Sequence, residues 1–133
     1  MGRKPMTSFD SFAEQYAKTM GDTGDYTHRK TINPTLFKAI GNFKGKVIYD
    51  IGCGNGYIAK KLAREGAKEV RAPDISKKLI SIAKNEYENP GNKIKYFVSE
   101  ASDFSNLPKN HFDLIIMNMS IHYIKDFEKF ARV

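Results

Sequence analysis

The chain has 133 residues, 41% of them hydrophobic and 28% charged, which is the balance of one globular domain with a single core. Its apolar runs are short and its N-terminus lacks a basic and apolar leader, so we expect no membrane span and no secretion signal, and we predict a cytoplasmic protein. The formal net charge of +7 favours an anionic partner, but no aromatic residues interleave with a basic stripe, so nucleic acid is not the favoured substrate.

Two amphipathic helices are predicted before the first strand. The segment Ser11–Glu14 has the form of a capping box, and apolar residues recur at helical spacing over Phe9–Met20. After a turn-rich loop, Asn33 can cap and Pro34 can open a second helix that ends near Gly41. This second helix is expected to bury Leu36, Phe37 and Ile40.

The rest of the chain alternates strands and helices joined by short loops, which predicts an α/β fold with a parallel sheet and helices on both of its faces. The strands are expected at about Lys46–Ile51, Glu69–Asp74, Ile94–Ser99 and Phe112–Met119, and the helices at about Gly56–Glu65 and Lys77–Glu88. Proline lacks the backbone N–H that a strand ladder uses, so Pro73 is expected to end the second strand early. The basic residues of these helices are expected on solvated faces, among them Lys60, Lys61 and Arg64.

The most informative segment is the first strand with the loop that follows it. The strand ends near Asp50, and glycine then occupies every second position at Gly52, Gly54 and Gly56 before a helix begins. Glycine lacks a Cβ and adopts positive φ, so such a loop lets a ligand approach the backbone closely. A dinucleotide fingerprint needs its third glycine at position 57, where the chain has Tyr57, so an NAD-dependent oxidoreductase is kept only as a weaker alternative.

Polar side chains stand at the predicted carboxyl ends of all the strands. In a doubly wound sheet the ligand lies across these ends, where the strand order reverses beside the first strand. The residues alone therefore predict a single rim of polar groups that faces a ligand. The side chains at these ends are Asp50, Asp74, Glu100 and Asn118.

The spacing Asp-x-Gly-x-Gly-x-Gly from Asp50 resembles the first motif of the class I, Rossmann-like S-adenosylmethionine-dependent methyltransferases. Three later segments resemble the next motifs of this family in the same order, at residues 70–76, 97–103 and 112–118, with His122 after the last. The resemblance is to the small-molecule type. It implies S-adenosylmethionine as cofactor and an enzyme that transfers a methyl group to a small-molecule acceptor by in-line displacement, leaving S-adenosylhomocysteine.

Family members normally build seven strands in about 200 residues or more, whereas this chain has 133. We therefore expect one domain over residues 1–133 that is incomplete after its fourth strand, with residues 1–44 as a helical cap segment within it. Two interpretations stay open, a methyltransferase and a non-catalytic fragment that binds S-adenosylmethionine. Without a fifth strand, Phe112–Met119 would expose an unpaired edge, so we expect it to pair with another chain or to be capped by local segments.

The resemblance also implies roles for individual residues in cofactor binding. The methionine part of the cofactor would meet the backbone of the glycine loop, with Asp50 near its ammonium group. Asp74 would accept hydrogen bonds from both ribose hydroxyls, which suits the two oxygens of a carboxylate. The loop residues of this set are Gly52, Cys53, Gly54 and Gly56.

The adenine contact is expected after the third strand. Glu100 stands where aspartate is usual and Asp103 follows it, so the choice between these two acids stays open. The Ala101 amide would lie near a ring nitrogen, and Ile75 would pack on the base. Asn118, at the end of the fourth strand, completes the cofactor-binding set.

Several of these residues also have structural interpretations. Asp74 could cap the helix after it, although Ser76 is better placed, and Asp50 could tie the loop amides together. Tyr16 resembles a tyrosine that closes over the cofactor in many relatives, and a packing role fits its apolar helix face equally well. His122 is the first candidate for a general base, if the reaction needs one.

Cysteine and histidine are sparse. Cys53 is the only cysteine, so an internal disulfide is excluded, and its place in the glycine loop fits a small packing residue better than a nucleophile. His28 and His111 have no Cys, His or acid at ligand spacing, so we infer no metal site.

Overall fold

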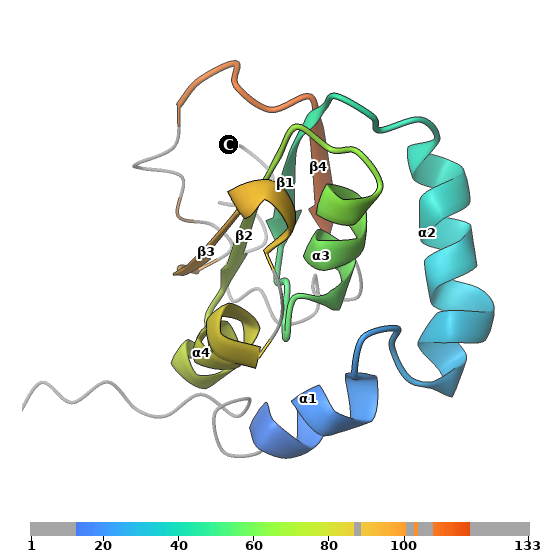
Figure 1. Ribbon diagram of the computed structural model, residues 1–133, viewed down its shortest axis with the longest axis vertical. Helices are drawn as coiled ribbons and strands as arrows, with labels where there is room; N and C mark the ends of the chain where they lie inside the picture. The colour runs from blue at the N-terminus through green and yellow to red at the C-terminus, as the bar shows by residue number, and fades with distance from the viewer. Residues whose placement is uncertain (1–12, 87–88, 101–102, 104–107, 118–133) are drawn as a thin grey trace, which may run out of the picture.

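The computed structural model describes residues 13–86, 89–100, 103 and 108–117, and they form an α/β fold (Figure 1). All strand pairs are parallel, and the strand order is β3-β2-β1-β4. The strands are β1 (Val47–Ile51), β2 (Glu69–Asp74), β3 (Ile94–Val98) and β4 (Leu114–Met117). The helices between them are α3 (Tyr57–Arg64) and α4 (Lys77–Glu86), and the short 3-10 helix η3 (Pro90–Asn92) follows α4. The predicted parallel sheet is therefore confirmed.

Both α3 and α4 pack on the same face of the sheet. The chain moves in one direction from β1 to β2 to β3, and right-handed crossovers then place both helices on one side. The helices meet the sheet in a core that includes Leu62, Ala63, Ile80 and Ala83. The strands contribute Ile48, Val70, Ala72, Ile94, Tyr96 and Ile116. Helices on the second face were also expected, and the segment between β3 and β4, where the first would lie, is only partly described.

The second strand does not end early at Pro73. β2 continues to Asp74, and Pro73 pairs in register with Phe97 of β3. The last paired residue of β2 on the β1 side is Arg71, opposite Tyr49. The Pro73 carbonyl faces the same side, where it accepts hydrogen bonds from the Gly52 and Cys53 amides. The pairing of β1 with β2 has already ended at this position, so no strand hydrogen bond needs the N–H that proline lacks.

The N-terminal segment forms α1 (Ala13–Met20), the π-helix η2 (His28–Ile32) and α2 (Asn33–Ile40). The start of the predicted first helix, with its capping box, lies outside the described residues. Figure 1 shows α1 beside α4, near the end of the sheet where the strands finish. The two helices share a small apolar cluster of Ala13, Ala17, Leu79 and Ile82.

The prediction that Asn33 caps the second helix is wrong. Helical backbone already runs through η2, and the residue before α2, Ile32, has helical φ and ψ. Asn33 is consequently the first residue of α2, and its side chain bonds to other segments. The apolar residues of α2 pack as partly buried side chains against the main core; they are Leu36, Phe37 and Ile40. Among the described residues, no helix combines the length and apolar character needed to cross a membrane.

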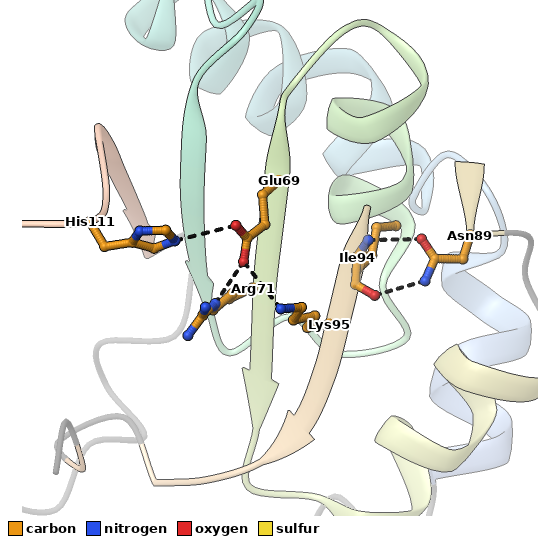
Figure 2. Close-up of polar contacts among 6 residues, drawn as sticks. All are labelled: Glu69, Arg71, Asn89, Ile94, Lys95 and His111. Carbon is orange, nitrogen blue, oxygen red and sulfur yellow. Dashed lines mark hydrogen bonds and ion pairs between the residues drawn. The ribbon is translucent and has the colours of Figure 1, made fainter. Parts of the chain in front are cut away.

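The second face of the sheet carries a charged network at the amino ends of the strands (Figure 2). Glu69 accepts a hydrogen bond from Arg71 Nε at 2.8 Å, and its other oxygen lies 3.3 Å from His111 Nε2. Lys95 Nζ lies 3.8 Å from the first oxygen. Glu69 thus links β2, β3 and the segment before β4. Figure 2 also shows Asn89 paired with both backbone groups of Ile94, which holds the start of β3.

Candidate functional site

The loop after β1 is a turn made of left-handed glycines. Gly52, Gly54 and Gly56 have φ values of 69°, 60° and 86°, which side chains rarely adopt. The Gly56 amide donates to the Cys53 carbonyl at 3.0 Å, and Gly56 is the residue before α3. A Cβ on Gly56 would lie 2.7 Å from Tyr96 Oη. The loop therefore needs glycine for its conformation and, at Gly56, for its packing.

Asp74 holds this loop in place from the end of β2. The Gly54 amide donates to Asp74 Oδ2 and the Ser76 amide to Asp74 Oδ1, both at 2.9 Å. Ser76 Oγ in turn accepts the Leu79 amide at 3.1 Å, so Ser76 caps α4 as expected. The task of tying the loop amides belongs to Asp74 and not to Asp50. A carboxylate oxygen can accept more than one hydrogen bond, so these amides do not prevent Asp74 from receiving a ligand's donors.

Asp50, in β1 two residues before the glycine loop, is buried, with 3% of its surface exposed. Within the described part of the chain, its Oδ2 atom has no hydrogen-bond partner. Burial, and then the nearby charge of Asp74, raise the pKa of Asp50 to about 7. A buried acceptor without a partner lowers the stability of the fold, so a carboxyl group of this kind is suited to bind a donor or a cation of a ligand.

Cys53 packs between the loop and β2. It is buried, and its thiol donates to the Ala72 carbonyl at 3.4 Å. Burial, with the charges of Asp74 and Asp50, raises the pKa of the Cys53 thiol well above its usual value. This environment suits a packing residue and opposes a thiolate nucleophile.

Tyr16 of α1 lies over the glycine loop. A Cβ on Gly54 would be 3.2 Å from the Tyr16 ring and 3.3 Å from its hydroxyl oxygen. The side chain is partly buried and packs against both apolar clusters of the molecule. The N-terminal segment therefore reaches the predicted rim.

The acids after β3 take different places. The Ser99 amide donates to the Asp74 carbonyl at 3.0 Å, which holds the residue before Glu100 at the end of β2. Glu100 itself is exposed. The Asp103 amide donates to the Glu100 carbonyl at 3.0 Å. Burial, and then the charge of Asp103, raise the pKa of Tyr49 to about 12. The choice between the two acids for an adenine contact stays a prediction.

Ile75 directly follows Asp74 and is 39% exposed, one of few large apolar side chains left open in the described structure. Three further members of the predicted set lie outside the described residues, namely Ala101, Asn118 and His122. The structure thus brings together the glycine loop, Asp50, Asp74 and Tyr16. The roles of Ala101, Asn118 and His122 stay predictions from the sequence.

Sequence reasoning missed a set of polar contacts between the N-terminal segment and α3. Lys60, expected on a solvated face, has a side chain only 5% exposed, and its Nζ contacts Asp22 Oδ1. Asn55 Nδ2 donates to the Gly21 carbonyl at 2.9 Å. The available signal was the opposite charge of Asp22 in the turn-rich loop, although nothing in the sequence paired it with Lys60.

The described histidines also have acidic partners. His28 Nδ1 lies 2.8 Å from Asp25 Oδ1, and the same oxygen accepts the His28 amide at 2.9 Å. His111 belongs to the network of Glu69. In the described ranges, no group of three or more Cys, His, Asp and Glu side chains comes together as a metal site would need.

The chemistry of this rim is that of a ligand-binding site. It offers a buried carboxyl group whose Oδ2 atom has no partner among the described residues, a second carboxylate whose oxygens can each accept several donors, and a turn in which three of the five residues are glycines without a Cβ atom. Such a set can hold a ligand that carries a cationic group and hydroxyl donors.

Comparisons with known proteins agree on one group. A family model described as "Methyltransferase domain" matches residues 49–133. Several curated relatives are named ubiquinone biosynthesis O-methyltransferase, among them proteins from Coxiella burnetii and Aromatoleum aromaticum. The protein from Coxiella burnetii is 35% identical over 100 residues, which are 71% of this chain and 41% of the relative. The protein from Aromatoleum aromaticum is 26% identical over 118 residues, which are 86% of this chain and 50% of the relative.

Solved structures give the same result. An S-adenosylmethionine dependent methyltransferase from Mesorhizobium loti matches with a TM-score of 0.66 and 27% identity, over 74% of this chain and 44% of that one. The chain spans half or less of the length of each of these relatives.

Proposed function

The chain belongs to the methyltransferase domain family, and from this premise we propose that it binds S-adenosylmethionine at the glycine loop and transfers its methyl group to a small-molecule acceptor. The family match and the named relatives are methyltransferases, so the weaker alternative of an NAD-dependent oxidoreductase has no support.

The observation that carries this proposal is the buried Asp50 carboxyl group. Its Oδ2 atom has no partner among the described residues, and Asp50 is two residues before a turn whose glycines let a ligand touch the backbone. The ammonium group of S-adenosylmethionine supplies the cation and the donors that Asp50 lacks. Asp74 would accept the ribose hydroxyls on the same two oxygens that receive the loop amides.

The remaining contacts are proposed on the same basis. Tyr16 would close over the methionine part, because it already lies against Gly54. Ile75 is exposed beside Asp74, where an adenine base could pack on it. Glu100 or Asp103 would hold the amino group of the base.

S-adenosylmethionine, when bound, supplies an activated methyl group for in-line displacement by a nucleophile of the acceptor. The work of the protein is then to orient the two reactants and to exclude water, which suits a site of backbone groups, acids and a covering tyrosine. If a base is needed, His122 remains the first candidate, and it lies outside the described residues.

The acceptor is proposed to be a small molecule with a hydroxyl group, since the named relatives are O-methyltransferases of ubiquinone biosynthesis. The second candidate is a non-catalytic unit that binds S-adenosylmethionine with the same acids and glycine loop. Release of S-adenosylhomocysteine from S-adenosylmethionine in the presence of phenolic acceptors would separate the two.

We also propose that residues 1–133 form one domain with residues 1–44 as its cap segment, since Tyr16, Phe37 and Phe43 pack against the sheet core. Residence in the cytoplasm remains a prediction from the sequence. Self-association through the edge of β4 is proposed because β4 lies at the end of the described strand order.

The cofactor proposal is tested by calorimetric titration with S-adenosylhomocysteine. We expect saturable binding that Asp74→Ala weakens at least tenfold, because two ribose hydroxyls would lose their acceptor. The control Glu65→Ala removes an exposed carboxylate paired with Lys61 and should bind normally. Binding of NAD without S-adenosylhomocysteine would contradict the proposal, and so would equal binding by Asp74→Ala.

A further inference from the structure

A second set of contacts joins the N-terminal segment to the glycine loop through α2. Tyr57, the residue after Gly56, donates its hydroxyl proton to Asn33 Oδ1 at 3.1 Å. Asn33 Nδ2 donates to the Thr23 carbonyl at 3.0 Å. We call Thr23, Gly24, Asn33 and Tyr57 the cap joint. It connects the first residue of α3, the first residue of α2 and the loop after α1.

Gly24 makes the close approach at the cap joint possible. It is buried with a φ of 86°, and a Cβ there would lie 3.1 Å from Tyr57 Oη and 3.2 Å from Asn33 Nδ2. The same Cβ would lie 2.7 Å from the Cβ of His28. Any side chain at position 24 would therefore push the loop away from both hydrogen-bonding groups.

The cap joint is connected to Tyr16 through α1. The amides of Gly21 and Gly24 donate to the carbonyls of Ala17 and Met20 at 2.8 and 2.7 Å, which ties the loop to the last turn of α1. Tyr16, one helical turn earlier, lies against Gly54. The N-terminal segment therefore contacts the glycine loop through Tyr16 at Gly54 and through the Gly21 carbonyl at Asn55, and it contacts the residue after the loop through the bond between Asn33 and Tyr57.

The hydroxyl of Tyr57 is a dependable donor. Burial is the main reason that the pKa of Tyr57 is raised above its usual value, so the phenol stays protonated throughout the physiological range. His28 packs edge-on against the same ring, with centroids 6.5 Å apart and planes at 89°. The ring is thus fixed by packing, while the hydroxyl alone makes the bond to Asn33.

We propose that Asn33 and Tyr57 are positioning residues for cofactor binding, which act by holding Tyr16 over Gly54. This inference rests on the proposed binding of S-adenosylmethionine at the glycine loop. Neither residue needs to touch the ligand. Each fixes the N-terminal segment so that the entropy of ordering Tyr16 is lost on folding and not on binding.

Tyr57→Phe is the sharpest variant, because it removes the hydroxyl and keeps the packed ring. We expect its dissociation constant for S-adenosylhomocysteine, measured by calorimetry, to rise about threefold to tenfold, the worth of one hydrogen bond. Asn33→Ala removes both bonds of the joint and should weaken binding more. Thr35→Ala, on the same helix as Asn33, is the matched control, since it deletes the 2.7 Å bond to the Thr31 carbonyl and keeps both bonds of the joint.

A double-mutant cycle with Tyr16→Ala separates positioning from general stabilisation. If Tyr57 acts through Tyr16, then adding Tyr57→Phe to Tyr16→Ala will leave the dissociation constant nearly unchanged. An equal loss in both backgrounds, or unchanged binding by Tyr57→Phe alone, would overturn the inference.

Amide hydrogen exchange of the free protein tests the joint separately from the proposed function. We expect Tyr57→Phe to speed exchange at Gly21 and Gly24 and to leave β2 protected. If the wild type binds no S-adenosylhomocysteine, the proposed function fails, and unchanged exchange at these glycines would overturn the cap joint on its own evidence.

Discussion

Two carboxyl groups at the site have opposite environments, although each comes from a strand end. Asp74 receives the amides of Gly54 and Ser76, which satisfies its charge. Asp50 is buried, and within the described structure its Oδ2 has no partner. A buried acceptor without a partner costs stability and persists where a ligand uses it. The residue that destabilises the free protein is therefore the one proposed to meet the ligand's cation.

Asp50→Asn should stabilise the free protein and abolish ligand binding. The folded-state pKa of Asp50, about 7, exceeds that of an unfolded aspartate, so the folded state prefers the neutral acid. Stability is therefore lost as the pH rises from about 4 to about 7, and a neutral amide at this position would avoid the loss. We expect a gain of about 1 to 3 kcal/mol in the free energy of unfolding near pH 8, by urea denaturation. A loss of stability would contradict this account of Asp50.

Binding of S-adenosylhomocysteine should weaken as the pH falls below about 7. The ammonium group of the ligand requires an ionised Asp50, and the free protein carries a proton there at lower pH. Binding should then release a proton, which calorimetry in buffers of different ionisation enthalpy detects. The affinity should fall by up to about tenfold per pH unit in this range. A flat profile between about pH 5 and pH 8 would show that Asp50 does not pair with the ligand.

At the scale of elements, the sheet is fastened at both ends by polar contacts between segments distant in sequence. Asp113, just before β4, accepts the Val47 amide on its carboxylate and donates its own amide to the Val47 carbonyl, both at 2.8 Å. Glu69 joins β2 to Lys95 of β3 and to His111. Asp74 performs the same task at the carboxyl ends. The loops that carry the site residues therefore follow strands whose register is fixed by these contacts.

Glu69→Gln should destabilise the protein near neutral pH and have little effect in acid. The hydrogen bond from Arg71 is the main cause that holds the pKa of Glu69 below its usual value, so its stabilisation is present above the unfolded pKa and is lost as the pH falls. We expect a loss of about 1 kcal/mol near pH 7 by urea denaturation, which disappears near pH 3.

Glu65→Gln is the control for this measurement, because its pair with Lys61 is half exposed on both sides. It should change the free energy of unfolding by less than about 0.5 kcal/mol at either pH. Equal effects of the two substitutions would mean that the Glu69 network adds nothing beyond a surface pair.

At the scale of the whole molecule, the two faces of the sheet differ. The first is covered by α3 and α4, and the second carries charged and aromatic side chains, with Ile115 of β4 55% exposed. β4 is also the last strand in the described order. An exposed apolar strand at a sheet edge is a template for another strand. The proposed self-association would therefore take place through the edge of β4.

Ile115→Lys should reduce self-association without loss of folding. The side chain is mostly exposed, so the substitution removes little buried surface and places a charge on the edge strand. We expect the weight-average mass by light scattering to fall towards 15.1 kDa, with a change of less than about 0.5 kcal/mol in unfolding free energy. Wild-type protein that is already monomeric at high concentration would contradict the proposal.

Sequence by itself determined the strands, the helices between them and the glycine turn, because period, turn chemistry and positive φ are properties of neighbouring residues. It also placed Asp50 and Asp74 at the ends of strands. Predictions from the sequence were wrong where a contact between segments distant in sequence overrode a local preference. Pro73 was expected to end β2. The strand continues because Pro73 pairs with β3, and on the β1 side, where an N–H would be needed, the pairing has already ended at Arg71.

Only the tertiary structure decided which acid serves which group. Asp74 reaches the Gly54 amide across 20 positions, and Lys60 is buried against Asp22 across 38. Asn33 acts as a link to Tyr57 and not as a helix cap. The first contact depends on the pairing of β1 with β2, and the other two depend on the packing of the N-terminal segment against α3. Strand pairing and packing join surfaces that are brought together only on folding, which no window of neighbouring residues contains.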